Sequence, residues 1–182
     1  MSNPKIQEEV RHTLSILVDD EPGVLARVIG LFSGRGYNIE SLTVAGVDEK
    51  HKLSRISIVT RGTPMIIEQV KAQLDRIIPV HSVRDLTEQG RHIERELVLI
   101  KIANTGESRI EALRIADTFR ARTLDSTLES FVFEITGSSS KITAFIELMR
   151  SLGELEVSRT GVSAISRGSD IDMPTQHHID MK

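Results

Sequence analysis

The stretch HTLSILVDDEPGVLARVIGLFSGRG, residues 12–36, places a strand pattern, a turn and a helix pattern in immediate succession. In HTLSILVD, Leu14, Ile16 and Val18 recur at every second position, which is the spacing of a strand with one buried face. After DDEPG the apolar spacing changes to that of an amphipathic helix that runs through Phe32. Residues 12–36 therefore predict a strand followed directly by a helix that packs on it.

The two ends of this helix carry their own signals. Pro22 suits the first helical position, and Asp20 or Glu21 is a candidate side-chain cap for the free N–H groups. Gly34 and Gly36 mark the other end, because glycine takes the left-handed conformation that often closes a helix.

The next segments complete a known order of elements. Residues 38–47 and 52–60 are two β-rich runs around a charged turn and predict a hairpin. Thr63 and Pro64 begin a second helix that Pro79 closes, and residues 79–86 supply one more strand. The buried stripe expected of the second helix is Ile66, Ile67, Val70, Leu74, Ile77 and Ile78. The order βαββαβ predicts an antiparallel sheet with two helices on one face.

The same order starts again after residue 90. Residues 95–104 read as a strand, 108–121 as a helix, 122–130 and 131–137 as a strand pair, and 138–152 as a helix before two short strands. We therefore predict an α+β protein of two tandem ferredoxin-like βαββαβ units. Its divisions are an N-terminal extension (1–11), a first domain (12–87), a second domain (88–168) and a flexible tail (169–182).

Composition excludes several classes of function. The chain has 182 residues with 23 Lys and Arg against 26 Asp and Glu, so it lacks the positive charge that nucleic acids and anionic membranes attract. It has no cysteine, which rules out thiol chemistry and disulfides. Neither a secretory signal nor an apolar run of membrane length is present, so we expect a cytoplasmic protein.

The turn DDEPG admits three interpretations. Asp19, Asp20 and Glu21 could bind a metal ion or transfer protons, or they could only cap the helix. In the third interpretation, Gly23 lets a small carboxylate approach the free N–H groups of the helix, Asp20 meets the ammonium group of the same ligand, and Asn38 contributes polar contacts. This last arrangement would bind an amino acid.

Other candidate motifs favour structural roles. The glycines of residues 30–36 follow a helix and so do not form a dinucleotide-binding turn. The six histidines lack the spacing of a zinc site, and Ser138 lies at a helix start, where capping explains it. We find no set of residues that forms a catalytic site or binds a metal.

Residues 97–100, Leu-Val-Leu-Ile, are apolar on both faces of a strand although helices should cover only one. Either a second chain covers the other face, which would make the protein a homo-oligomer, or the strand is buried within its own unit.

The stretch LSILVDDEPGVLARVIGLFSGRGYNIESLTVAGV (14–47), followed by LSRISIVTRG (53–62), resembles the ACT domain of the acetolactate (acetohydroxyacid) synthase small-subunit family. IERELVLIKI (93–102), ADTFRARTLDSTLES (116–130), FEITGSSSKITAFIELM (133–149) and EVSRTGVSAISRG (156–168) resemble the carboxy-terminal domain of the same family. The most specific segments are RGYNIESLTV and RTGVSAISRG.

The resemblance implies a non-catalytic subunit that stimulates a separate large catalytic subunit and mediates feedback inhibition by a branched-chain amino acid, with valine the leading candidate. Thiamine diphosphate, Mg²⁺ and FAD are then expected on the large subunit and no cofactor on this chain. Effector sites of the family lie between two ACT domains of a homodimer. Carried over, they comprise Asp20, Gly23, Val24, Leu25, Asn38 and Ile39. Many relatives have Asn at the position of Asp20.

Three other functions remain to be distinguished. A stand-alone ACT-domain sensor of amino acids would regulate a different partner. An independent enzyme would need a catalytic constellation that these residues do not supply. RNA-recognition motifs share the βαββαβ order, but their stacking aromatic residues have no counterpart in residues 12–19 or 52–60.

Overall fold

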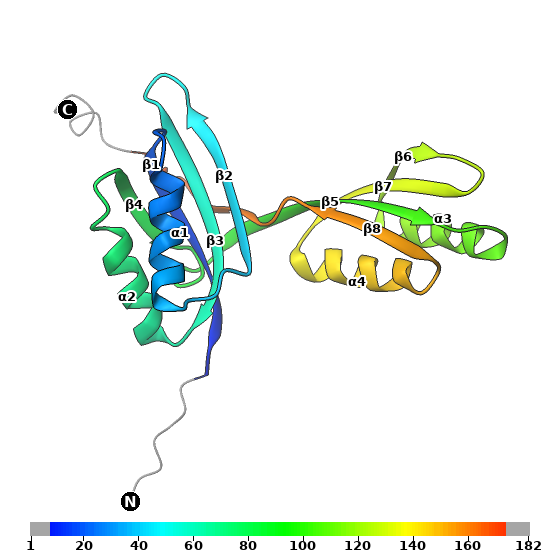
Figure 1. The fold of residues 1–182 in the computed structure, drawn as a ribbon, viewed down its shortest axis with the longest axis horizontal. Helices are drawn as coiled ribbons and strands as arrows, with labels where there is room; N and C mark the ends of the chain where they lie inside the picture. Colours follow the sequence, from blue (N-terminus) through cyan, green and yellow to red (C-terminus); the bar gives the residue numbers. More distant parts are fainter. Residues whose placement is uncertain (1–7, 174–182) are drawn as a thin grey trace, which may run out of the picture. The chain divides into compact units, whose positions relative to one another are not determined.

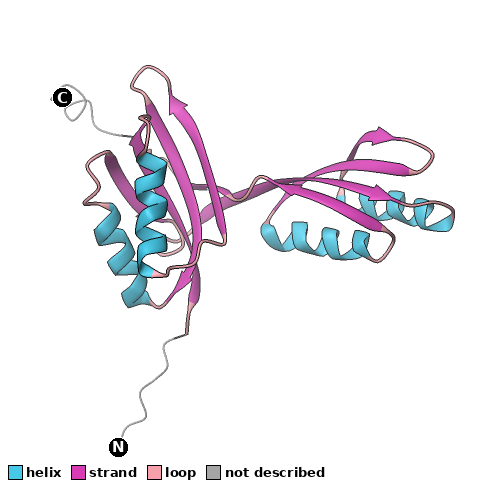
Figure 2. Ribbon diagram, viewed as in Figure 1, coloured by secondary structure: helices cyan, strands magenta, loops and turns pink. Residues whose placement is uncertain are grey.

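The computed structural model describes residues 8–173. The chain forms two compact units, the first made of residues up to Ile93 together with those from Ala164 onward, and the second made of Glu94–Ser163. The first unit is built on a four-stranded antiparallel sheet and the second on a five-stranded one, each with two helices on one face (Figures 1 and 2). The predicted α+β class and the tandem repeat are confirmed.

The first unit follows the predicted order of elements. They are β1 (Val10–Asp19), α1 (Val24–Arg35), β2 (Ser41–Asp48), β3 (Leu53–Gly62), α2 (Pro64–Leu74) and β4 (Val80–Asp85). The strands lie in the order β2-β3-β1-β4, and β2 and β3 form the predicted hairpin. Because β2 lies at the edge, one side of its backbone has no neighbouring strand within the sheet.

The core of the first unit lies between its helices and its sheet. Leu14, Ile16 and Val18 of β1 alternate toward the helices, as their period of two predicts. Ile16 pairs with Ile56 of β3, and both are fully buried. All residues of this core cluster lie between Leu14 and Val83.

Two predicted helix boundaries were wrong. Helix α1 begins at Val24 with Gly23 as its N-cap residue, so Pro22 is not helical and no side chain of Asp20 or Glu21 caps it. Helix α2 ends at Leu74, and turns in which Arg76 N–H donates to Gln73 and Ile77 N–H donates to Leu74 lead the chain to Pro79. Ile78 is consequently 87% exposed rather than buried.

Other predicted ends are confirmed. Thr63 caps α2 through its side chain, with Pro64 at the first position. The left-handed Gly36 closes α1 after it has continued through Gly34. Ser138 accepts a hydrogen bond from Lys141 N–H and caps the second helix of the other unit.

The second unit repeats the first. It contains β6, β7, β5 and β8 in this spatial order, which matches β2-β3-β1-β4 position by position. Its elements are β5 (His92–Ala103), α3 (Glu107–Phe119), β6 (Arg122–Ser126), β7 (Ser130–Gly137), α4 (Ser139–Arg150) and β8 (Glu154–Arg159), followed by β9 (Ser163–Ser166), which pairs with β5. Its core has its own phenylalanines, Phe131, Phe133 and Phe145.

An ion pair joins two neighbouring strands of the second unit. Arg159 of β8 donates two hydrogen bonds of 2.7 Å to the carboxylate of Glu96, whose side chain is only 3% exposed. The carboxylate raises the pKa of the Arg159 guanidinium. Glu96 is therefore buried as a paired charge.

The strand at residues 97–100 is covered on one face only. Val98 and Ile100 belong to the core, whereas Leu99 is 37% exposed and Leu97 is half-buried. Burial within its own unit therefore does not explain the apolar second face.

The two ends of the chain differ from the expected divisions. Val10 and Arg11, expected in an extension, already belong to β1, and residues 1–7 lie outside the described part. Asp170 and Asp172, expected in a flexible tail, form ion pairs with the first unit. The rest of the predicted tail, residues 174–182, is outside the described residues.

Candidate functional site

The turn between β1 and α1 is fixed on both sides by neighbouring strands. The carboxylate of Asp19 lies 2.5 Å from the ring of His81 on β4. The backbone N–H of Asp20 donates to the carbonyl of Lys52 at 2.6 Å. Asp19 thus has a structural partner, while the side chain of Asp20 remains exposed and available to a ligand.

Helix α1 begins without a side-chain cap. Gly23 has φ 90°, a conformation that favours glycine, and no side chain among the described residues accepts a hydrogen bond from the first turn. A Cβ atom built on Gly23 would meet nothing within 4 Å. The N–H of Val24 donates to the carbonyl of Glu21 at 3.4 Å, whereas those of Leu25 and Ala26 have no hydrogen-bond partner among the described residues, so these two are free to bind a carboxylate.

The apolar residues predicted for the site differ in accessibility. Val24 is 3% exposed and its side chain belongs to the core, so only its backbone faces the turn. Leu25 and Ile39 are half-buried against the edge of the same core. Leu25 and Ile39 can contact a ligand, whereas the Val24 side chain cannot.

Asn38 lies at the opposite end of α1 from Gly23. The helix between them has 12 residues, which corresponds to a length of about 18 Å. The backbone carbonyl of Asn38 accepts a 2.6 Å hydrogen bond from the hydroxyl of Thr60, and the side chain of Asn38 is exposed. One copy of the chain therefore does not bring Asn38 and Ile39 together with the turn at Asp20–Leu25.

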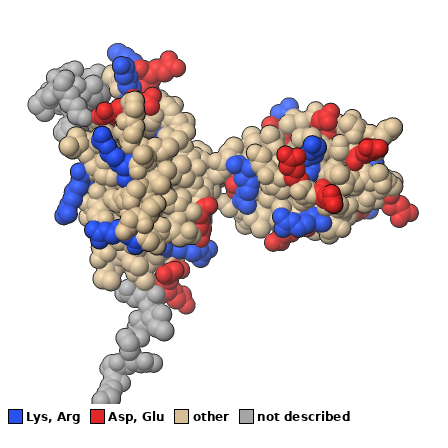
Figure 3. All heavy atoms as spheres, viewed as in Figure 1, with Lys and Arg blue, Asp and Glu red and all other residues tan. Residues whose placement is uncertain are grey.

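The described residues offer no support for a metal site at the turn and no surface of a single charge on the face shown in Figure 3. Among residues 8–173, no three His, Asp or Glu side chains gather in a way that could hold a metal ion. On the face in Figure 3, basic and acidic side chains are interspersed in both units. No helix in the described part of the chain is long and apolar enough to cross a membrane.

Sequence reasoning missed a second polar cluster in the first unit. Arg55 and Arg84 project from the sheet face that the helices leave uncovered, and they bind Asp172 from the end of the described chain. Isolated arginines on strands are typical of solvated faces, so no signal in the sequence pointed to this cluster.

Comparisons with known proteins agree with these two units. The family described as "AHAS small subunit-like ACT domain" matches residues 14–82, and "Small subunit of acetolactate synthase" matches residues 95–168. A probable acetolactate synthase small subunit from Archaeoglobus fulgidus is 46% identical over 160 residues, which cover 88% of this chain and 99% of the relative. The chain belongs to the acetolactate synthase small-subunit family.

Two further members of this family support the assignment along most of the chain. The acetolactate synthase isozyme 3 small subunit of Escherichia coli is 44% identical over 163 residues, covering 89% of this chain and 99% of that one. The crystal structure of the small subunit from Thermotoga maritima is 36% identical and superposes with a TM-score of 0.78, covering 88% and 99% of the two chains. Family membership thus extends over both units.

Proposed function

We propose that this chain is the regulatory, non-catalytic subunit of a cytoplasmic acetolactate synthase. Its partner is the large catalytic subunit, which carries thiamine diphosphate, Mg²⁺ and FAD. Family membership over both units supports the partner, and the uncapped N-terminus of α1 at Gly23 is the observation that carries a regulatory role.

The effector in this proposal is a branched-chain amino acid, with valine first. Its α-carboxylate binds the first N–H groups of α1, and the exposed Asp20 meets its ammonium group. Leu25 and Ile39 contact the branched side chain. Discrimination among valine, leucine and isoleucine is modest, because one methylene changes the binding free energy by about 1–3 kcal/mol.

The site is completed by a second copy of the chain. Asn38 and the turn at Gly23 lie at opposite ends of α1, so one ligand reaches both only when the turn comes from one copy and Asn38 from the other. In a twofold dimer this arrangement gives two equivalent sites.

Two features of the first unit favour such a dimer. Edge strand β2 exposes Val44 and Val47, at 45% and 47% of their surface. Helix α1 turns Ala26, Gly30 and Gly34 outward at four-residue spacing. A sheet edge and a helix face without bulky side chains allow two copies to approach closely.

Inhibition follows if the effector favours one arrangement of the holoenzyme over another. An amino acid that binds both arrangements equally shifts nothing, whatever its affinity. Because a site shared by two copies changes when their relative position changes, an effector bound there has different affinities for different dimer arrangements.

The test is carboligation of pyruvate by the cognate large subunit, with and without this chain, across titrations of valine, leucine and isoleucine. Stimulation by the chain together with inhibition by valine is the expected result. Stimulation without inhibition by any of the three would refute the effector site but keep the subunit assignment. If the chain has no effect on the large subunit, it acts instead as a stand-alone amino-acid sensor.

A further inference from the structure

The sheet face of the first unit that carries no helix is nevertheless buried in its centre. Ser15 and Leu17 of β1 point to this side and are 1% and 0% exposed. The strand register places Arg84 beside Ser15, and it places Arg55 and Ser82 on the two sides of Leu17. Four polar side chains from three strands thus form one patch around Leu17.

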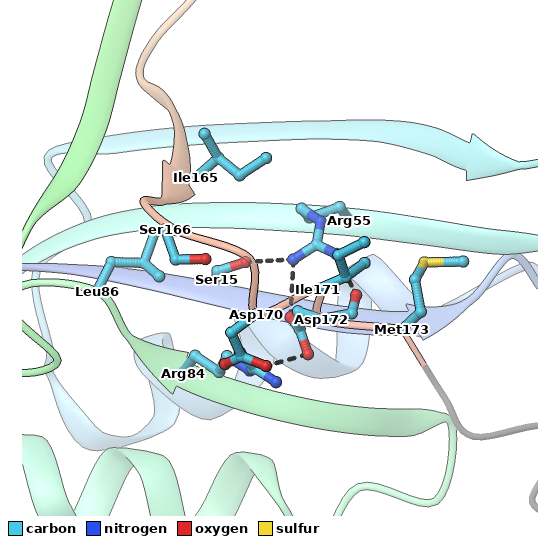
Figure 4. A pocket seen from close by; sticks show the side chains of 11 residues that line it. Ser15, Arg55, Arg84, Leu86, Ile165, Ser166, Asp170, Ile171, Asp172 and Met173 are labelled. Carbon is cyan, nitrogen blue, oxygen red and sulfur yellow. Dashed lines mark hydrogen bonds and ion pairs between the residues drawn. The ribbon is translucent and has the colours of Figure 1, made fainter.

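The segment Gly168–Met173, called the strap below, covers this patch (Figure 4). Asp172 of the strap is 9% exposed and is bound by three side chains. One carboxylate oxygen lies 2.8 Å from Arg55 Nη1; the other accepts from Ser82 Oγ at 2.8 Å and lies 3.0 Å from Arg84 Nε. The Asp172 main-chain carbonyl also accepts from Arg55 Nη2 at 2.7 Å.

The patch is itself organised to receive this carboxylate. Arg55 also donates to Ser15 Oγ at 2.8 Å, which holds the guanidinium in place. Two arginines and a hydroxyl that converge on both oxygens of one carboxylate form charge-assisted hydrogen bonds, which are stronger and more directional than neutral ones. This is the donor set of a carboxylate-binding site.

The remainder of the strap is held weakly. Within the described residues, no backbone-to-backbone hydrogen bond joins the strap to the sheet, and the one such bond inside the strap joins Met173 N–H to the carbonyl of Ile171. Ile171 is 77% exposed, and Asp170, which pairs with Arg84 at 2.8 Å, is 78% exposed. A cavity of about 170 Å³ is lined by both the strap and the strands beneath it. The attachment therefore depends on Asp172.

We propose that Arg55, Arg84 and Ser82 form a carboxylate-binding site on the open face of the first sheet, and that the chain's own Asp172 is its resident ligand. The strap is a displaceable cover: when Asp172 leaves the site, Ser15 and Leu17 become accessible and the two arginines can accept another aspartate side chain. This site lies on the opposite face of the sheet from α1 and is independent of the amino-acid effector.

The absence of cysteine from the chain permits a direct test. A Ser15→Cys variant of the full chain carries a single thiol beneath the strap, and its rate of reaction with a disulfide reagent reports strap opening. Adding Asp172→Asn should raise this rate about tenfold or more, because it removes the charge from a largely buried, charge-assisted cluster. Adding Asp170→Asn, the exposed matched control, should change it less than about twofold.

A second arm tests binding in trans. A blocked peptide with the sequence of residues 168–173, added at millimolar concentration, should slow the reaction of the Asp172→Asn protein again, and the same peptide with Asn in place of Asp172 should not. Circular dichroism checks that each variant is folded. If the Ser15→Cys variant does not fold, Leu86→Cys replaces it as the probe, because Leu86 is 2% exposed and lines the same cavity.

Equal reaction rates for Asp172→Asn and Asp170→Asn would overturn the proposal. The proposal would also be overturned if the Asp172→Asn protein reacts faster but the peptide that contains aspartate does not slow its reaction. Protection of the parent chain that depends on protein concentration would show that the strap comes from a second copy, and would overturn the assignment of a ligand from the same chain.

Discussion

Gly23 is the residue on which the effector site depends most. Its positive φ begins α1 without a side-chain cap, and its missing side chain leaves space beside the N–H groups of Leu25 and Ala26. Gly23→Asp should place a carboxylate where the ligand's own carboxylate binds. We expect loss of valine inhibition with normal stimulation of the large subunit, measured by carboligation.

The matched control for this variant is Gly106→Asp. Gly106 is the N-cap of α3, also has positive φ and also has open space around it, but it belongs to the second unit. The aspartate costs about 1 kcal/mol of backbone strain at Gly23, which is left-handed, and about 1–3 kcal/mol at Gly106, whose φ of 63° and ψ of −139° suit glycine alone. Normal valine inhibition in Gly23→Asp, or its loss in Gly106→Asp, would refute the assignment of the site to the turn of the first unit.

The ion pair between Glu96 and Arg159 predicts an asymmetric mutational cost. Arg159→Leu leaves a carboxylate that is 3% exposed without its partner, so we expect the second unit to lose about 3 kcal/mol of stability. Glu96→Gln leaves a guanidinium that is 39% exposed and can be hydrated, so its cost should be about 1 kcal/mol. Urea unfolding measures both, and a larger loss for Glu96→Gln would contradict this account.

At the residue level, the sequence predicted features that depend on residues close together in the chain, such as helix ends. It predicted a helix start at Thr63 and a helix cap at Ser138, because a hydroxyl just before a helix can accept a hydrogen bond from the free N–H groups of the first turn. It assigned a cap to Asp20 or Glu21 incorrectly, because Gly23 begins the helix in a conformation that those residues rarely adopt. The role of Asp172 was not predictable, because its partners, the nearest of which in sequence is Arg84, belong to strands that precede the whole second unit in the chain.

Among the elements, α1 combines two functions in the proposed dimer. In this proposal its N-terminus binds the effector, and its outward face of small residues lets a second copy approach. Gly30→Arg should therefore abolish dimerisation without unfolding the chain, because Gly30 has nothing within 4 Å of its Cβ position. Sedimentation velocity measures the change in mass.

Ala144→Arg provides the matched control for Gly30→Arg, since Ala144 is also exposed on a helix but lies on α4 of the second unit. It should leave the oligomeric state unchanged. A Gly30→Arg protein that still sediments as the parent does would show that α1 lies outside the interface.

Element types were predictable from periodicity, and element ends were less so. The pattern of α2 extends to Ile78, yet the helix ends at Leu74 and the chain passes through turns to Pro79, which cannot lie in a helix interior. Apolar spacing alone does not reveal where a helix ends here, because proline restricts the backbone and leaves the pattern of apolar side chains unchanged.

For the whole molecule, the repeated order of elements predicts that each unit has its own core. The core clusters agree, since one lies within residues 14–83 and the other within residues 98–157. A fragment of residues 1–93 should fold cooperatively, with a lower melting temperature than the first unit has in the full chain, because it lacks the strap whose Asp172 pairs with Arg55 and Arg84. Circular dichroism checks this, and a fragment without a cooperative transition would contradict separate cores.

The repeat was visible in the sequence because each unit carries the same order of periodicities. The sequence did not show that the open sheet face is covered, because the covering residues, 164–173, come back to the first unit only after the whole second unit. The proposed completion of the effector site by a second chain was suggested by the apolar second face of residues 97–100 and by the family resemblance. The turn and Asn38 alone were interpreted as one site, although Gly23 and Asn38 lie at opposite ends of a helix.

The most direct test of the shared site mixes two defective copies. Gly23→Asp and Asn38→Ala homodimers should each fail to bind valine in calorimetry. After unfolding and refolding of a 1:1 mixture, mixed dimers should contain one site with both residues intact, so binding should return to about a quarter of the wild-type capacity. If the mixture binds no valine while the wild-type chain binds it after the same refolding, the turn and Asn38 do not form one site across two copies.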